Sequence, residues 1–193
     1  MNVYDFDKTI YDGDSTIDFW RYCLKRHPWS IRRIPRTVFS FILFRLGIGS
    51  REKFKECFYR FLKDIDNCEN EVKAFWDKNM KKIKPWYLSQ KNESDLVVSA
   101  SPEFLISEAC KRLNINFIAS KVDTKTGLLL SPNCRGEEKV NRVFSEFQNV
   151  EIENFYSDSH SDISLAQKSQ NAYLVKKNRL IKWEIDFNKQ EKL

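Results

Sequence analysis

A chain of 193 residues can bury a hydrophobic core, and its 41% hydrophobic and 31% charged residues, with only five Gly and five Pro, exclude a repetitive or disordered protein. Five scattered cysteines argue against a disulfide framework or zinc knuckle and predict reduced thiols in the cytosol, and Met1 lies too close to the first apolar run for a cleavable signal peptide. The net charge of +6 is unevenly distributed along the chain.

Five short apolar runs, described by their ending in a small or acidic residue, predict buried strands. In chain order they are Asn2–Asp5, Asp95–Ser99, Asn116–Ala119, Ile152–Tyr156 and Ala172–Val175. Helical patterns lie between them at Pro102–Leu113, with Ser101 as the expected N-cap, and at Glu137–Phe147. The alternation predicts βαβ units and an α/β fold with a parallel sheet.

Two segments depart from this alternation. Residues 15–90 have helical periodicity and no convincing strand, so we expect an α-helical insertion after the first strand. Residues 121–132 are expected to form a small hairpin that turns at Thr126–Gly127.

Polar residues stand where the expected strands end or the following helices begin: Asp5, Asp7, Ser99, Lys139, Asp158 and Asp162. In open α/β sheets, ligands bind outside the carboxyl ends of the strands. Asp5 and Asp7 are two residues apart on an extended segment, so their carboxylates point the same way and can share a hard cation. Mg²⁺ together with the Lys139 ammonium would neutralise a phosphate dianion.

Four segments in chain order resemble the motifs of the haloacid dehalogenase superfamily of aspartyl-phosphate phosphatases. They are Asp5-Phe6-Asp7-Lys8-Thr9, Val97-Val98-Ser99-Ala100-Ser101, Gly136-Glu137-Glu138-Lys139 and Ser157-Asp158-Ser159-His160-Ser161-Asp162. The branch is subfamily IB, which is similar to phosphoserine phosphatase and bacterial phosphatidylglycerophosphatase C. The resemblance covers nearly the whole chain and implies a Rossmann-like, doubly wound parallel sheet from residues 1–14 and 91–193, with residues 15–90 as an α-helical cap.

The resemblance also implies the chemistry. Asp5 would attack phosphorus and form an acyl phosphate, and Asp7 would protonate the leaving oxygen and later activate water. Asp5, the backbone carbonyl of Asp7, and Asp158 would hold Mg²⁺. Lys8 stands where the family often has Gly or Ser, and Ser157 where Gly is common, but neither departure removes a catalytic group.

Phosphate binding is implied for three further positions. Ser99, the Ala100 amide and Lys139 would contact the phosphoryl oxygens, with Thr9 and Asp162 in supporting places. Two other polar residues receive no role. His160 is expected to be exposed, and for Cys134 buried packing is favoured over a reactive thiol.

Caps in this family select the leaving group and exclude water, so we expect residues 15–90 to determine substrate specificity. Asp14 lies where phosphoserine phosphatases place an acid for the substrate amino group, but a helix N-terminal role is at least as good a reading. Arg51 is the second candidate for contact with the substrate, at the start of a helix.

The excess of positive charge lies within residues 19–51, which hold eight basic residues and no acid: Arg21, Lys25, Arg26, Arg32, Arg33, Arg36, Arg45 and Arg51. Inside this block, Thr37–Ile48 is apolar for about three helical turns and too short to span a bilayer. It fits either an interfacial helix on an anionic membrane or the core of the cap, and the sequence leaves both interpretations open.

The leading hypothesis is Mg²⁺-dependent hydrolysis of a phosphomonoester, with a lipid phosphate such as phosphatidylglycerophosphate as the candidate substrate. The alternatives are a soluble metabolite such as phosphoserine, and a non-catalytic binder of anionic membrane or nucleic acid, although the filled catalytic positions disfavour the binder. Transfer to another alcohol and the oligomeric state stay open. We expect a cytoplasmic protein with peripheral contact at the inner face of the membrane.

Overall fold

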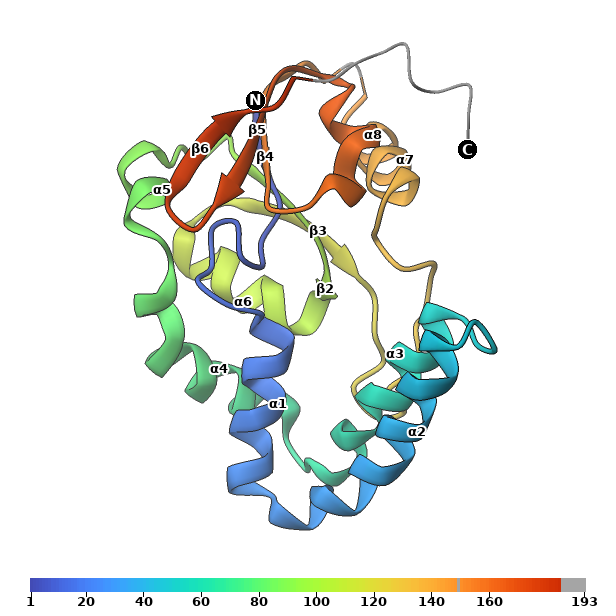
Figure 1. Ribbon diagram of the computed structural model, residues 1–193. Coiled ribbons are helices and arrows are strands. Elements are labelled where there is room, and N and C mark those ends of the chain that lie inside the picture. Colours follow the sequence, from blue (N-terminus) through green and yellow to red (C-terminus); the bar gives the residue numbers. More distant parts are fainter. Residues whose placement is uncertain (149, 185–193) are drawn as a thin grey trace.

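A computed structural model describes residues 1–148 and 150–184, and within them one six-stranded sheet has the order β3-β2-β1-β4-β5-β6 (Figure 1). The strands are β1 (Asn2–Tyr4), β2 (Leu96–Pro102), β3 (Asn116–Ser120), β4 (Ile152–Ser157), β5 (Ser169–Lys176) and β6 (Arg179–Lys182). Strands β1 to β5 are parallel, as predicted. The antiparallel edge strand β6, which pairs with β5, was not predicted from the sequence.

Helices cover both faces of the sheet, which confirms the doubly wound α/β class. Helix α6 (Glu103–Leu113) lies on one face, and α7 (Glu137–Glu146) and α8 (Ile163–Ala166) lie on the other. The central strand β1 shows why both layers are needed: Tyr4 belongs to the apolar cluster of the α6 face and Val3 to that of the α7 face. A parallel strand buried on both sides is therefore apolar at successive positions.

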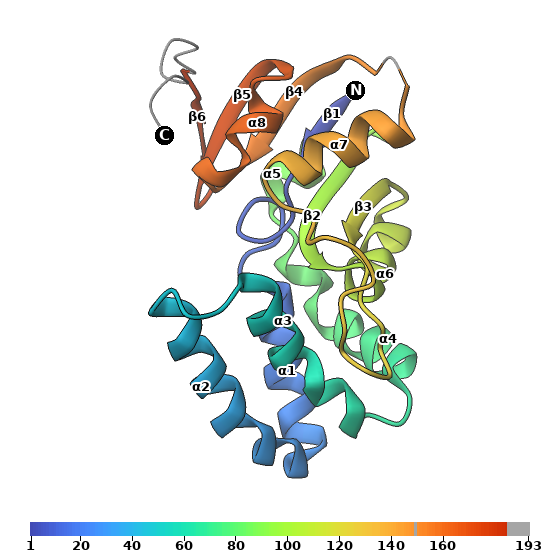
Figure 2. The ribbon, with the colours of Figure 1, turned by 90° about the vertical axis from the view of Figure 1, so that its right-hand side faces the viewer.

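Between β1 and β2, residues 15–90 contain helices and no strand of the sheet, as predicted. The helices are α1 (Ser15–Arg26), η1 (Pro28–Arg33), α2 (Ile34–Arg45), α3 (Arg51–Tyr59), η2 (Arg60–Asp64), α4 (Cys68–Asn79), η3 (Met80–Lys82) and α5 (Pro85–Gln90). Figures 1 and 2 show α1, α2 and α3 projecting away from the sheet as a separate lobe.

The last helices of this segment return to the sheet. The indole of Trp76 on α4 donates a hydrogen bond of 2.8 Å to the Leu105 carbonyl on α6. Tyr87 on α5 packs edge-on against Tyr4, with ring centroids 4.9 Å apart. The cap boundary at residue 90 stays a prediction, and these contacts show that α4 and α5 also form part of the layer over the sheet.

One expected helix start is wrong. Helix α6 begins at Glu103 with Pro102 as its N-cap residue, and no side chain caps it. Ser101 lies one residue too early to cap the helix, and its hydroxyl donates to the Asp7 carboxylate instead. The expected hairpin is present in reduced form, as a single bridge between Val122 and Leu129.

All five cysteines are free thiols, and Cys134 is fully buried. His160 is exposed, as expected. Among the described residues, no helix is long and apolar enough to cross a membrane.

Candidate active site

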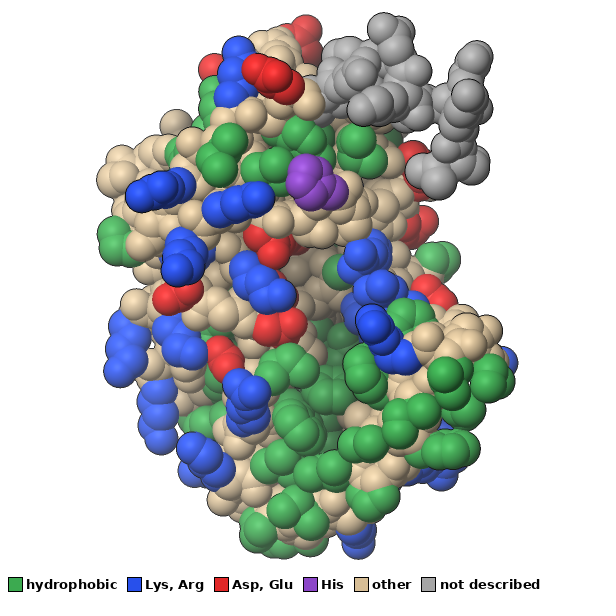
Figure 3. Space-filling model, in the orientation of Figure 1, with side chains coloured by type: hydrophobic (Ala, Val, Ile, Leu, Met, Phe, Trp, Pro, Cys, Tyr) green, Lys and Arg blue, Asp and Glu red, His purple; other side chains and the backbone are tan. Residues whose placement is uncertain are grey.

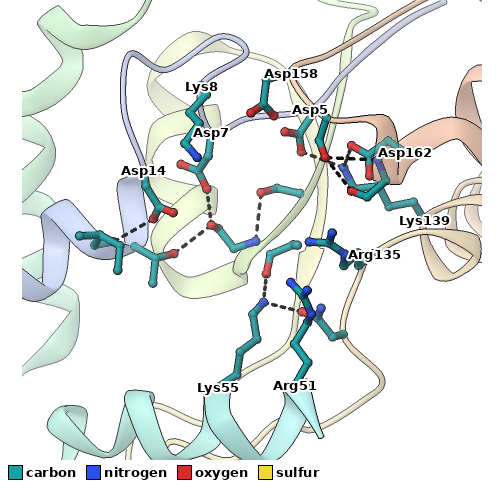
Figure 4. A pocket seen from close by; sticks show the side chains of 18 of the residues that line it. Asp5, Asp7, Lys8, Asp14, Arg51, Lys55, Arg135, Lys139, Asp158 and Asp162 are labelled. Carbon is teal, nitrogen blue, oxygen red and sulfur yellow. Dashed lines mark hydrogen bonds and ion pairs between the residues drawn. The ribbon is translucent and has the colours of Figure 1, made fainter. Parts of the chain in front are cut away.

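The carboxyl ends of β1, β2 and β4 open into a cavity of about 340 Å³ that α1 and α3 close from the opposite side. Figure 4 shows Asp5, Asp158 and Asp162 on the sheet side and Asp14 at the start of α1, with Arg51 and Lys55 extending toward the cavity from α3. The charged residues that line the cavity are five acids and five bases, namely Asp5, Asp7, Asp14, Asp158 and Asp162, and Lys8, Arg51, Lys55, Arg135 and Lys139. A bound Mg²⁺ with a phosphate dianion would leave this balance unchanged.

Asp5, Lys139 and Asp162 form a chain of buried ion pairs. The Lys139 ammonium lies 2.7 Å from the Asp5 carboxylate and 2.8 Å from that of Asp162. The Ser157 hydroxyl donates to the same Asp162 oxygen at 2.8 Å, so Asp162 fixes the direction of the ammonium. Burial opposes the charge on Lys139, yet the two carboxylates hold the pKa of this ammonium above its ordinary value.

The carboxylate of Asp5 is only 13% exposed. Burial raises its pKa to about 7, against the Lys139 ammonium, which lowers it. Its backbone N–H donates to the Tyr156 carbonyl at 2.8 Å, which continues the pairing of β1 with β4 beyond the end of the strand. Asp5 is thus held by backbone and side chain at the floor of the cavity.

The Asp7 carboxylate is held by two donors from different elements. The Ser15 backbone N–H at the start of α1 donates to it at 2.6 Å, and the Ser101 hydroxyl donates to its other oxygen. Burial, followed by the charge of Asp14, raises the pKa of Asp7 to about 6. A carboxyl group with a pKa near neutrality can both give and take a proton at physiological pH.

Asp158 lies beside Asp5 in Figure 4 and follows β4. Its backbone N–H donates to the buried Thr9 hydroxyl at 2.9 Å, which ties the fourth motif to the first. Burial raises the pKa of Asp158, and Lys8 opposes this rise. Lys8 has a φ of 59°, in the left-handed region that glycine adopts readily and lysine adopts with strain. Lys8 therefore replaces the family's Gly or Ser at a position where the backbone conformation favours Gly.

The donors present fit Mg²⁺. No group of three or more His, Cys, Asp or Glu side chains suited to a metal occurs in the described ranges 1–148 and 150–184. Mg²⁺ does not need such a cage, because it is commonly held by one or two carboxylates, water and substrate phosphate. Asp5 and Asp158 supply two neighbouring, partly buried carboxylates whose negative forms are disfavoured without a cation.

The second motif bends around the cavity at the end of β2. The buried Ser99 hydroxyl accepts a hydrogen bond of 3.1 Å from the Ser101 N–H. The Ala100 carbonyl accepts from the Lys55 ammonium at 2.6 Å, so this ammonium joins the cap to the second motif. Lys55 also donates to the Asn133 side-chain oxygen at 2.6 Å.

The two candidate substrate residues lie in the cavity wall, with different partners. Asp14 caps α1, where its carboxylate accepts from the Ile17 N–H at 3.0 Å, so the N-terminal interpretation is confirmed. Arg51 begins α3, and its pKa is lowered by burial and then by Arg135. Neither Arg51 nor Arg135 forms an ion pair with an acid in the described part of the chain.

Sequence reasoning gave no site role to several residues that line the cavity, among them Lys55, Ser101, Asn133 and Arg135. Lys55 is four residues after Arg51, so an i, i+4 search along the helix from Arg51 would have found it. Asn133 and Arg135 lie in the loop before Gly136 and carry no motif. Their position depends on how that loop folds over the second motif.

Comparisons with known proteins agree with this geometry. The haloacid dehalogenase-like hydrolase family matches residues 3–167. A search of curated proteins found no match. A solved protein of unknown function from Bordetella pertussis Tohama I has 19% identity and a TM-score of 0.70, covering 89% of this chain and 87% of that one.

Two further solved structures carry phosphoserine-related descriptions. A phosphoserine phosphohydrolase-like protein from Francisella tularensis has 16% identity and a TM-score of 0.54, covering 89% of this chain and 86% of that one. A probable phosphoserine phosphatase from Vibrio cholerae has 11% identity and a TM-score of 0.65, covering 89% of this chain and 55% of that one. At these identities the likeness is one of fold.

Proposed function

We propose that this chain, which belongs to the haloacid dehalogenase-like hydrolase family, is a Mg²⁺-dependent phosphatase that forms an acyl phosphate on Asp5. The observation that carries the proposal is the chain of ion pairs from Asp5 through Lys139 to Asp162, placed beside an Asp7 carboxylate that two donors orient. This arrangement supplies a fixed nucleophile, a fixed cation and a proton carrier in one cavity.

In the first step, a carboxylate oxygen of Asp5 attacks phosphorus and the bond from phosphorus to the leaving oxygen breaks. Asp7, protonated at this stage, gives its proton to that oxygen, so a neutral alcohol departs. The Lys139 ammonium, together with the Ser99 hydroxyl and the Ala100 N–H, offers donors to the phosphoryl oxygens.

In the second step, Asp7 is a carboxylate and takes a proton from water, whose oxygen attacks the phosphorus of the acyl phosphate. The bond from phosphorus to the Asp5 oxygen breaks, so inorganic phosphate is released and the Asp5 carboxylate is regenerated, while Asp7 holds the proton for the next cycle. When bound by Asp5, the Asp7 carbonyl and Asp158, Mg²⁺ would offset the negative charge of the phosphoryl group.

For the substrate we propose a lipid phosphate such as phosphatidylglycerophosphate, at a peripheral contact with an anionic membrane. A cavity of about 340 Å³ is small for a whole lipid and large enough for a phosphorylated head group. Arg51 and Arg135, which lack acidic partners among the described residues, favour a second anionic group near the phosphomonoester. Recognition of an amino group, as in phosphoserine, has less support, because Asp14 already accepts the Ile17 N–H.

The test of the mechanism is Asp5→Asn, assayed with a soluble phosphomonoester in the presence and absence of Mg²⁺. Loss of a covalent nucleophile should lower kcat by about 10⁴-fold or more. Asp12→Asn is the matched control, since Asp12 is exposed and does not line the cavity, and it should retain activity. Equal activity of Asp5→Asn and the wild type would refute the mechanism.

The test of the substrate class is a screen of phosphomonoesters. It compares phosphatidylglycerophosphate in mixed micelles with phosphoserine, and it quantifies both inorganic phosphate and any phosphorylated alcohol. Strong turnover of one soluble ester with no gain from the lipid would replace the lipid proposal by the soluble one.

A further inference from the structure

Helix α2 and the turn that follows it present apolar side chains to solvent. Six of them define what we call the α2 surface: Val38, Phe39, Phe41, Ile42, Leu46 and Ile48, which are 49%, 61%, 44%, 48%, 66% and 70% exposed. No residue of α2 is classed as buried. Figure 3 shows hydrophobic side chains gathered over the lower right of the molecule, where Figure 1 places α2.

This exposure argues against one of the two interpretations that the sequence left open, the one that places these side chains in the core of the cap. If Thr37–Ile48 formed the core of the cap, its aromatic and aliphatic side chains would be buried. The structure instead attaches α2 to the cap through one side, where Phe54 of α3 contacts Phe41 and Phe44 at ring-centroid distances of 5.3 and 6.0 Å. None of the described residues covers the other side, and contiguous exposed apolar patches of this kind mark interaction sites.

The chain segment that carries the α2 surface is basic. No acid lies in residues 19–51, and Lys25, Arg36 and Arg45 of this block have no ion pair in the described part of the chain. Elsewhere in the block, Asp64 pairs with Arg32 and Arg33 and so neutralises part of the charge. An apolar surface with basic flanks is complementary to an anionic lipid bilayer, whose head groups attract arginine and whose acyl region accepts phenylalanine.

The α2 surface is continuous with the wall of the active-site cavity. Phe54, which supports α2, also lines the cavity, together with Phe58 of the next helical turn. The Arg51 guanidinium lies 5.4 Å from the centre of the Phe44 ring and faces the same cavity. A lipid whose phosphorylated head occupied the cavity could therefore leave its chains in the bilayer against α2.

We propose that the α2 surface docks on the surface of an anionic bilayer, with α2 lying in the interface. This inference rests on the proposed function only for the placement of the lipid head group, because docking itself requires no catalysis. A second copy of this chain or an apolar partner protein are the competing occupants of the same surface, and the experiment below separates them from lipid.

The experiment is sedimentation of the full chain with vesicles of phosphatidylglycerol and phosphatidylcholine, compared with vesicles of phosphatidylcholine alone. We expect binding to the anionic vesicles and at least tenfold weaker partitioning of the double variant Phe39→Ser, Ile42→Ser. Phe144→Ser is the matched control, because Phe144 is 36% exposed on α7, on the lobe opposite α2 in Figure 2, and its partitioning should equal that of the wild type. Arg36→Ala should weaken binding about fivefold.

A second readout comes from Trp29, the one tryptophan classed as exposed in the described chain, at 54%. Its emission should shift to shorter wavelength with anionic vesicles, and Trp29→Phe should remove the shift. Hydrolysis of a soluble phosphomonoester serves as the check on folding, since the double variant should keep it. If the wild type hydrolyses the soluble ester but does not bind anionic vesicles, the docking proposal alone is refuted. If the wild type shows no hydrolysis, the proposed function is refuted.

Three results would overturn the proposal. One is absence of binding to anionic vesicles by the wild type. Another is equal partitioning of the wild type and the double variant. The third is a stable dimer in sedimentation velocity that the double variant dissociates, which would assign the α2 surface to a second copy of the chain.

Discussion

Lys55 is a lysine whose charge is opposed by its surroundings, and this gives a prediction about pH. Its ammonium donates to the Ala100 carbonyl and the Asn133 side-chain oxygen, each at 2.6 Å, and forms no ion pair with an acid in residues 1–148 and 150–184. Burial, and then the charges of Arg51 and Arg135, lower its pKa from 10.5 to about 8. The perturbation we choose is Lys55→Met, which keeps the length of the side chain and removes the charge.

The sign follows from proton binding. Between pH 8 and 10.5 the unfolded chain binds a proton at Lys55 that the folded chain has released, so the free energy of unfolding rises with pH across this window. A difference of about 2.5 pKa units corresponds to at most about 3 kcal/mol. This stability is fully present above pH 10.5 and is lost as the pH falls through about 8. Lys55→Met has no such dependence.

The assay is urea unfolding of the wild type and Lys55→Met at several pH values from 7 to 10.5. The difference in unfolding free energy between them should change by up to about 3 kcal/mol in favour of the wild type as the pH rises. Lys53→Met, at an exposed position of the same helix, is the control for loss of a lysine. A difference between the wild type and Lys55→Met that is independent of pH would refute the reasoning.

Two further predictions concern the contacts that join the lobes and the motifs. A Cβ at Gly127, where φ is +74°, would meet the Tyr59 backbone at 2.7 Å, so Gly127→Ala should lower the unfolding free energy by at least about 2 kcal/mol. Gly47→Ala is the control, because Gly47 has a φ of +75° and nothing within 4 Å, and it should cost about 1 kcal/mol. Similar losses for the two variants in urea titrations would show that the contact with Tyr59 contributes nothing. Thr9→Val removes the acceptor of the Asp158 N–H and should raise the half-saturating Mg²⁺ concentration for hydrolysis about tenfold. Thr9→Ser retains the hydroxyl and should leave this concentration unchanged. An unchanged half-saturating Mg²⁺ concentration in Thr9→Val would contradict the prediction.

The sequence predicted the sheet well because its signals are local. Buried parallel strands are apolar at consecutive positions, so they can be recognised in the sequence. Because parallel strands all end at the same edge of the sheet, the residues that directly follow them must lie at that edge. Asp5, Ser99 and Asp158 could therefore be placed in one cavity before the fold was known, and the structure brings them together there. The edge strand β6 was missed, because its four residues are all exposed and carry no pattern of burial.

Partners that come from distant segments could not be predicted. Lys55 meets Ala100 from 45 residues away, and Ser101 meets Asp7 from 94 residues away. The Ser101 error shows the cause: next to a proline and a helix, a serine is a good N-cap by local propensity, but the approach of Asp7 provides a charged acceptor that outweighs the cap. Local preferences decide a residue's role only when tertiary contacts offer nothing stronger.

Tertiary contacts also change the effective charge of the basic block, residues 19–51. Counted along the sequence it carries eight charges, but folding brings Asp64 to Arg32 and Arg33, and Glu71 to Arg26. An arginine near an anionic membrane contributes about 1 kcal/mol. A phenylalanine or isoleucine transferred fully from water contributes about 2 kcal/mol. Because pairing removes charges while the α2 surface keeps all six of its apolar side chains exposed, apolar burial should supply the larger share of docking. Binding to anionic vesicles should therefore weaken with salt but persist in 0.5 M NaCl, and complete release there would show that charge alone holds the protein to the membrane.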